Sequence, residues 1–185
     1  MRVISGTARG TKLLSQEGLN TRPTLDRVKE ALFNIIQFKV PNANVLDLFS
    51  GSGALGIEAL SRGADFATLA DNNREAINII TKNIEKTRLQ EKTKIVKGDY
   101  QDVLDNLSGT NNKFDIIFLD PPYKEDFALK AIEKITRYNL LTKDGIIIVE
   151  TNDAKKYQQI SNINKLEIFD ERKYGKVILI FIRKE

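Results

Sequence analysis

The chain of 185 residues contains no cysteine, no histidine and no tryptophan. Without cysteine, disulfides, thiolate nucleophiles and Cys/His zinc sites are excluded. Without histidine, triads and acid–base mechanisms that need an imidazole are excluded as well. Any chemistry must therefore use carboxylates, hydroxyls, backbone groups, lysine, arginine or a bound cofactor, and we expect no metal.

Long hydrophobic runs are also missing. The longest is the six residues from Val177 to Ile182, far below the roughly 20 residues that span a membrane as a helix. The first residues do not have the pattern of a signal peptide. A composition of 41% hydrophobic and 29% charged residues is typical of a soluble globular protein. We therefore expect a cytoplasmic protein without a membrane partner, of a length compatible with a monomer.

The net charge of +4 is concentrated at one end of the chain. Residues 1–29 contain six basic and two acidic side chains, whereas the basic and acidic side chains of residues 30–185 cancel. A basic segment on a neutral body indicates a polyanionic partner. A solvated, flexible terminus would give the same charge pattern, so charge alone leaves both interpretations open.

After this segment, strand-like apolar runs alternate with helical stretches. The strands are expected at 45–49, 66–70, 94–96, 114–119, 145–150, 165–169 and 177–182, with helices at 54–62, 74–87, 102–107, 127–138 and 154–160. This alternation predicts an α/β fold, a doubly wound, mostly parallel, seven-stranded Rossmann-like sheet. The last two strands are too close together for a parallel crossover, so the last strand must be antiparallel.

The residues before the sheet predict a small extension. Arg2–Ile4 and Lys12–Leu14, separated by Gly6 and Gly10, are expected to form a β-hairpin, and an amphipathic helix follows from Pro23. We therefore divide the chain into a basic hairpin and helix extension, residues 1–40, and a main domain, residues 41–185.

The first candidate for chemistry is the loop after the first strand of the sheet. Gly51, Gly53 and Gly56 stand where a strand becomes a helix, which lets a ligand approach the backbone closely. Asp71 follows the second strand, 20 residues after Gly51, and is suited to hold a ribose diol. Capping of the next helix is the alternative role for Asp71. The pattern predicts a nucleotide-type cofactor.

Two further acids favour S-adenosylmethionine over a nicotinamide cofactor. Asp47, directly before the loop, can meet an amino-acid ammonium group through water, and Asp99, after the third strand, can accept from an adenine amino group. The missing histidine also argues against many dehydrogenases. Each acid alone could cap a turn or helix. The neighbouring Phe49, Asn72 and Tyr100 complete the predicted cofactor site.

The most specific motif is Asp120-Pro121-Pro122-Tyr123, directly after the fourth strand. Two prolines fix the backbone and remove two N–H donors, so carbonyl oxygens are presented as acceptors. A carboxylate and a rigid carbonyl can accept both hydrogens of an exocyclic amine, and Tyr123 can stack on the base. Such contacts orient the amine nitrogen toward a sulfonium methyl without a nucleophilic side chain. The motif therefore predicts methyl transfer to an amino group, with a proline-rich turn as the bland alternative.

These motifs resemble class I S-adenosylmethionine-dependent amino-methyltransferases. Longer stretches narrow the resemblance to the bacterial 16S ribosomal RNA guanine-N2 methyltransferase (RsmD) family. The stretches that carry it are Arg2–Gly6, Arg9-Gly10, Arg22–Asn34 and Val45–Leu60.

The resemblance implies transfer to N2 of a guanine, guanine-966 in this family, in 16S ribosomal RNA. The implied partner is the assembled or nearly assembled small ribosomal subunit. By the same resemblance, Asp120 and Tyr123 contact the target base, and the loop glycines and Asp71 bind cofactor. The implied RNA contacts are Arg9, Lys12, Arg22 and Arg27. Family members often carry glutamate where Asp71 stands, which makes ribose binding less certain than loop binding.

Several alternatives stay open. Arg22 and Arg27 could dock the extension on acids instead of binding RNA. An adenine-N6 DNA methyltransferase uses the same four-residue motif, although about 40 residues before the sheet leave little room for duplex recognition. An inactive RNA-binding scaffold and a small NAD-binding module are the other rivals, which cofactor binding would separate.

Overall fold

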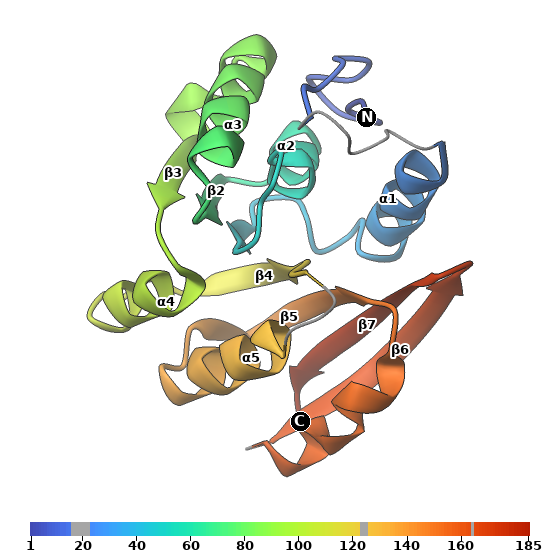
Figure 1. The fold of residues 1–185 in the computed structure, drawn as a ribbon, viewed down its shortest axis with the longest axis vertical. Helices are drawn as coiled ribbons and strands as arrows, with labels where there is room; N and C mark the ends of the chain where they lie inside the picture. The colour runs from blue at the N-terminus through green and yellow to red at the C-terminus, as the bar shows by residue number, and fades with distance from the viewer. Residues whose placement is uncertain (16–22, 123–125, 164) are drawn as a thin grey trace.

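A computed structural model describes residues 1–15, 23–122, 126–163 and 165–185. It contains one seven-stranded sheet in the order β3-β2-β1-β4-β5-β7-β6 (Figure 1). Strands β1 to β5 pair in parallel, and β7 is antiparallel to both β5 and β6. The strands are β1 Asn44–Asp47, β2 Phe66–Asp71, β3 Thr93–Lys97, β4 Phe114–Leu119, β5 Leu141–Thr151, β6 Leu166–Tyr174 and β7 Val177–Lys184. The predicted fold class is confirmed.

Helices cover both faces of the sheet (Figure 1). One face carries α1 (Pro23–Ile35), α2 (Ala54–Ser61) and α3 (Arg74–Thr87), and the other carries α4 (Tyr100–Ser108), α5 (Phe127–Arg137) and the 3₁₀ helix η2 (Ala154–Asn162). A short 3₁₀ turn, η1 (Gln90–Lys92), precedes β3.

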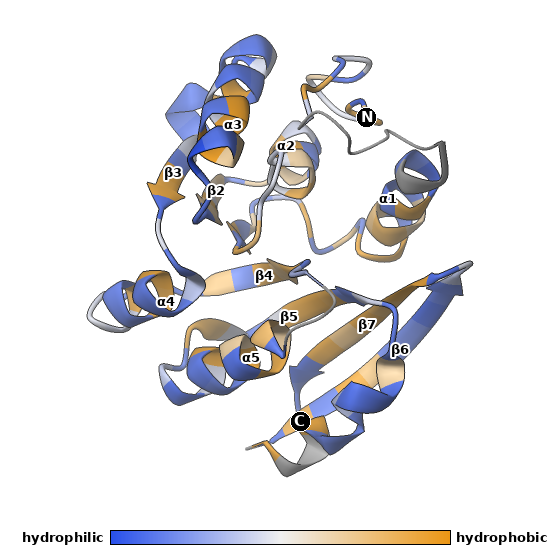
Figure 2. Ribbon diagram, in the orientation of Figure 1, coloured by the Kyte–Doolittle hydropathy of each residue, from blue (hydrophilic) through white to orange (hydrophobic). Residues whose placement is uncertain are grey.

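The core consists of two apolar layers, one on each side of the sheet. In β4, Ile116 and Phe118 belong to the layer under α1 to α3, while Ile117 and Leu119 belong to the layer under α4 and α5. Side chains alternate across a strand, so a strand covered on both faces is apolar throughout. Figure 2 shows the corresponding orange colour along β5 and β7. The continuous apolar runs in the sequence are thus explained by burial on both faces.

Some element bounds differ from the sequence prediction. β1 ends at Asp47 and not at Phe49, because the chain turns there and the Ser50 hydroxyl donates to the Asp47 carbonyl at 2.7 Å. β6 extends to Tyr174 because it pairs with β7 along its length at the sheet edge, where its polar side chains stay exposed. The helix expected at 154–160 is a 3₁₀ helix, the tighter form common in short connectors.

The predicted hairpin is present as a single antiparallel bridge between Arg2 and Lys12. Hydrogen bonds from Val3 N to Thr11 O (3.0 Å) and from Gly10 N to Val3 O (2.9 Å) close it. Val3 and Leu13 are buried in the same layer as α1 to α3, so the hairpin is packed on the sheet domain. The boundary between residues 40 and 41 stays a prediction. None of the helices in the described part of the chain is long and apolar enough to cross a membrane.

Candidate active site

The carboxyl ends of β1, β2 and β4 lie side by side at one edge of the sheet. Asp47, the last residue of β1, is in register with Leu69 of β2 and Phe118 of β4. The loops that leave these strands therefore start close together. Ligands of open α/β sheets bind at this edge, where the strand order reverses between neighbouring strands. Here the reversal lies between β1 and β4.

The glycine loop after β1 is held by backbone hydrogen bonds. Ser50 N donates to Ala70 O at 2.9 Å, and Gly53 N donates to Ser50 O at 2.7 Å. Gly51 (φ 56°) and Gly53 (φ 78°) are in the left-handed region, which glycine adopts without steric cost. A Cβ placed on Gly51 would meet nothing within 4 Å. The backbone at Gly51 is therefore open to a ligand, as the motif predicts.

Asp47 is a buried anion beside this loop. One of its oxygens accepts from Gly56 N at 3.1 Å, and burial raises its pKa to about 7. Among the residues that the structure describes, it has no cationic partner. A buried carboxylate is costly unless it is paired, so a ligand with an ammonium group would compensate its charge. The donor set fits the amino-acid end of S-adenosylmethionine.

The acids after β2 and β3 make local contacts. Asp71 accepts from Gly51 N at 2.8 Å and from Asn73 N at 2.9 Å, so it fixes the glycine loop. Asp99 is the N-cap of α4 and accepts from Gln101 N at 2.9 Å, which is the capping role that the sequence left open. Each carboxylate oxygen accepts more than one hydrogen bond, so contacts to ribose and adenine stay predictions. The same holds for Asn72, which is exposed.

Three aromatic rings lie between these loops. Phe49 follows β1, Tyr100 begins α4 and Phe127 begins α5. The centroid of Phe49 lies 5.3 Å from that of Tyr100 and 6.5 Å from that of Phe127, and Tyr100 and Phe127 are 5.3 Å apart. The predicted pair Phe49 and Tyr100 is thus brought together, and Phe127 is a member that the sequence prediction missed. A lone aromatic at a helix start gives no local signal of such a cluster.

Asp120 lies directly after β4, half-buried at the same edge. Burial raises the pKa of its carboxyl well above the ordinary value, and the nearby carboxylates of Glu150 and Asp47 raise it further. Pro121 is buried and Pro122 is exposed. Tyr123 lies outside the described residues. An acid in this position favours a cationic neighbour or a hydrogen-bond donor.

Glu150 is an acid that the sequence prediction missed. Strands β4 and β5 pair in register at Leu119 and Val149, so Asp120 and Glu150 follow at the ends of adjacent strands. The signal was an acidic residue closing an apolar strand, the same signal that singled out Asp120.

The predicted RNA contacts lie on the extension. Arg9, Lys12 and Arg27 are exposed, and Arg22 lies outside the described residues. Arg9 and Arg27 line one cavity of about 420 Å³; its other lining residues are Arg2, Val3, Ile4, Gly10, Asp26 and Glu30. The structure therefore brings two of the predicted contacts together with a third arginine. It places them on the extension and not at the sheet edge.

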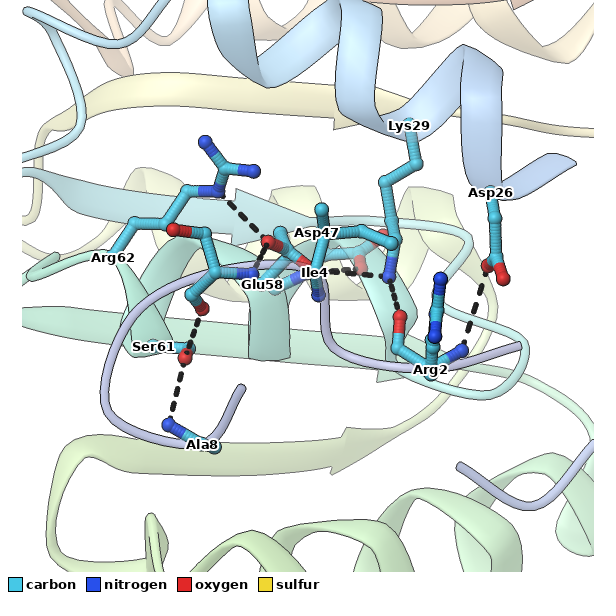
Figure 3. Close-up of polar contacts among 11 residues, drawn as sticks. Arg2, Ile4, Ala8, Asp26, Lys29, Asp47, Glu58, Ser61 and Arg62 are labelled. Atoms are coloured by element: carbon cyan, nitrogen blue, oxygen red, sulfur yellow. Dashed lines mark hydrogen bonds and ion pairs between the residues drawn. The ribbon is translucent and has the colours of Figure 1, made fainter. Parts of the chain in front are cut away.

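The extension docks through Glu58, a fully buried acid in α2. Its carboxylate accepts from Ile4 N at 2.8 Å and Ser5 N at 3.0 Å, and it pairs with Lys29 at 3.0 Å and Arg62 at 2.8 Å (Figure 3). Burial lowers the pKa of the Lys29 amine, while Glu58 acts in the opposite direction. Glu58 is a single acid in an otherwise apolar helix, which was a usable signal.

Arg27 does not take part in this docking. Within the described ranges, the ion pairs between extension and sheet domain are made by Lys29, Glu58 and Arg62, and Arg27 makes none. Its guanidinium is thus available to a ligand.

Comparison with known proteins agrees with this architecture. The family model described as "Conserved hypothetical protein 95" matches residues 1–183. The "Putative rRNA methyltransferase YlbH" of Bacillus subtilis is 40% identical over 81% of this chain and 82% of its own length. The "Ribosomal RNA small subunit methyltransferase D" of Haemophilus influenzae is 39% identical over 84% of this chain and 80% of its own length.

Among solved structures, the putative methyltransferase yhhF from Escherichia coli superposes with a TM-score of 0.86 at 31% identity. The comparison covers 100% of this chain and 98% of that one. Family model, sequence relatives and fold thus agree over nearly the whole chain. This chain belongs to the Conserved hypothetical protein 95 family, the RsmD family that its motifs resemble.

Proposed function

We propose that this protein is an S-adenosylmethionine-dependent methyltransferase that acts on N2 of a guanine, guanine-966 by family resemblance, in 16S ribosomal RNA. The observation that carries the proposal is the arrangement at the sheet edge. Asp47 and the glycine loop after β1 lie beside Asp120 and Pro121 after β4. The names of the relatives as rRNA methyltransferases support the reaction class and the substrate class.

The residues that would hold the cofactor surround the glycine loop. Asp47 compensates the ammonium group, Gly51 and Gly53 admit the ligand to the backbone, and Asp71 keeps the loop in shape. Phe49 and Tyr100 provide the apolar side of the adenine site, with Asp99 at its rim. When bound, S-adenosylmethionine supplies an electrophilic methyl group.

The target base is held by the motif after β4. The Asp120 carboxylate and a proline carbonyl accept from the exocyclic amine, which directs the nitrogen lone pair away from the base plane. The amine loses one proton as its bond to the methyl carbon forms. Positive charge on the cofactor lowers the pKa of Asp120 again, so the carboxylate is available as the acceptor when both ligands are present.

The extension supplies the RNA contacts. Arg9, Arg27 and Arg2 are exposed around one cavity, and Lys12 is exposed on the same hairpin. Guanidinium groups bind phosphate through paired hydrogen bonds. We assign this face to the RNA backbone near the target nucleotide in the small ribosomal subunit.

The test is methyl transfer from labelled S-adenosylmethionine to unmethylated small subunits, stripped 16S RNA and DNA in parallel, followed by separation of the nucleosides. Label in N2-methylguanosine from subunits or RNA is the expected result, and mapping its position tests guanine-966. Label in N6-methyladenine from DNA would overturn the substrate. Cofactor binding without label in any substrate would favour an inactive scaffold.

A further inference from the structure

Asn83, a buried residue of α3, joins two parts of the molecule that are far apart in sequence. Its Oδ1 accepts from Leu14 N at 2.8 Å, and its Nδ2 donates to Leu14 O at 3.0 Å and to Ser52 O at 2.9 Å. The side chain is 0% exposed. Both amide hydrogens and the amide oxygen are thus used.

The two partners of Asn83 have different roles. Leu14 ends the second strand of the N-terminal hairpin, and Ser52 stands in the glycine loop between Gly51 and Gly53. The Ser52 carbonyl belongs to the peptide bond that leads into Gly53, so its direction is coupled to the left-handed conformation of that glycine. A single side chain therefore fixes both the end of the hairpin and the shape of the loop.

We propose that Asn83 is a positioning residue that makes hairpin docking part of the cofactor site. The inference rests on the proposed function, because it assigns the Gly51 loop to the cofactor and the hairpin to RNA. Ordering of the loop by cofactor then strengthens the hold of Asn83 on Leu14, and docking of the hairpin strengthens cofactor binding. By linkage the two effects are equal in free energy.

The same helix offers a matched control. Lys86, three residues after Asn83, donates to Lys12 O at 2.5 Å and is exposed. Lys86→Ala therefore removes a contact between α3 and the hairpin without touching the glycine loop. Asn83→Ala and Asn83→Asp remove the donor to Ser52, and the Asp variant keeps an acceptor for Leu14 N.

The first measurement is the Kd of S-adenosylhomocysteine by titration calorimetry. Loss of hydrogen bonds to the loop is expected to raise the Kd about tenfold in both Asn83 variants, and Lys86→Ala should stay within about twofold of the unmodified protein. With saturating cofactor, the Asn83 variants should regain most of kcat, so that KM for S-adenosylmethionine carries the defect. An unchanged Kd, or a lost kcat with unchanged KM, would overturn the positioning role.

The second measurement needs no variant, so it does not depend on how well a variant folds. The Leu14 amide donates to Asn83, and its hydrogen exchange reports the opening of that bond. Saturating S-adenosylhomocysteine should slow exchange at Leu14 several-fold. If the cofactor analogue binds and Leu14 exchange is unchanged, this inference fails while the proposed function stands. If the unmodified protein does not bind the analogue at all, both fail.

Discussion

At the scale of single residues, the site is defined by anions without protein cations. Asp47 is buried without a positive partner among the described residues, and Asp120 stands near both Asp47 and Glu150. Concentrated negative charge of this kind destabilises the unliganded site, because each carboxylate disfavours ionisation of the others. A cofactor with positive charge relieves this repulsion, which links affinity to pH.

The first prediction concerns Asp47. Its pKa of about 7 means that the ionised fraction rises from about 0.1 to about 0.9 between pH 6 and pH 8. Since the ionised form pairs with the ammonium group, the affinity for S-adenosylhomocysteine should rise about tenfold over this range, as measured by calorimetry. Asp47→Asn should bind more weakly and show a nearly flat profile. A variant that keeps the full pH dependence would show that another group titrates.

The second prediction concerns Asp120. Asp120→Ala removes the acceptor that orients the target amine, so kcat should fall at least about 100-fold, while the Kd for S-adenosylhomocysteine changes less than about threefold. Asp115, in the same strand, accepts from Asn44 N and Thr142 Oγ1 at the other end of the sheet. Asp115→Asn is the control and should keep kcat. Substantial transfer by Asp120→Ala in single-turnover assays would contradict the amine-orientation mechanism.

At the scale of elements, helix α2 connects the extension to the cofactor loop. Its first turn donates from Gly56 N to Asp47, and its later turns carry Glu58 and Ser61. Ser61 accepts from Ala8 N at 2.9 Å and donates to Ser5 O at 2.6 Å. Gly6 lies so close to this helix that a Cβ would be 1.7 Å from Ser61 O. The hairpin therefore sits on the helix that leaves the glycine loop.

The third prediction follows from this docking. Glu58→Ala leaves Lys29 buried without its partner and removes the acceptor of two backbone N–H groups. Breaking a buried pair in this way costs about 3–5 kcal/mol, so the free energy of unfolding in urea should fall by about that amount. Glu85→Ala, an exposed acid of α3, should change it by less than about 0.5 kcal/mol. A loss below about 1 kcal/mol for Glu58→Ala would show that the extension docks mainly through its apolar residues.

The sequence was sufficient for those parts of the fold that depend on local pattern. The apolar run 114–119 and the glycines of the loop predicted β4 and the strand-to-helix turn, because burial on both faces and positive φ leave direct signatures. The roles of Glu58 and Asn83 were not predictable, since their partners lie 53 to 69 positions away in sequence. The cluster of Phe49, Tyr100 and Phe127 was found only in part for the same reason. Long-range contacts of this kind depend on topology.

At the scale of the whole molecule, charge and chemistry occupy different places. The net charge of +4 equals the excess within residues 1–29, whereas the carboxylates of the candidate site stand at the sheet edge. A basic face beside a neutral body attracts a polyanion without drawing its phosphates into the acidic site. RNA affinity should therefore depend on the extension and catalysis on the sheet edge.

The final prediction separates these two contributions. Replacing Arg9 and Lys12 with alanine removes two exposed cations from the hairpin. If each contacts a phosphate, the slope of log Kd against log salt should become shallower by about 1.4 on single-stranded RNA, while the Kd for S-adenosylhomocysteine is unchanged. The charge-matched control is Lys130→Ala with Arg137→Ala, two exposed cations of α5 on the opposite face of the sheet (Figure 1). Equal slopes for both double variants would show that the hairpin acts through its docking on α2 and not as an RNA contact.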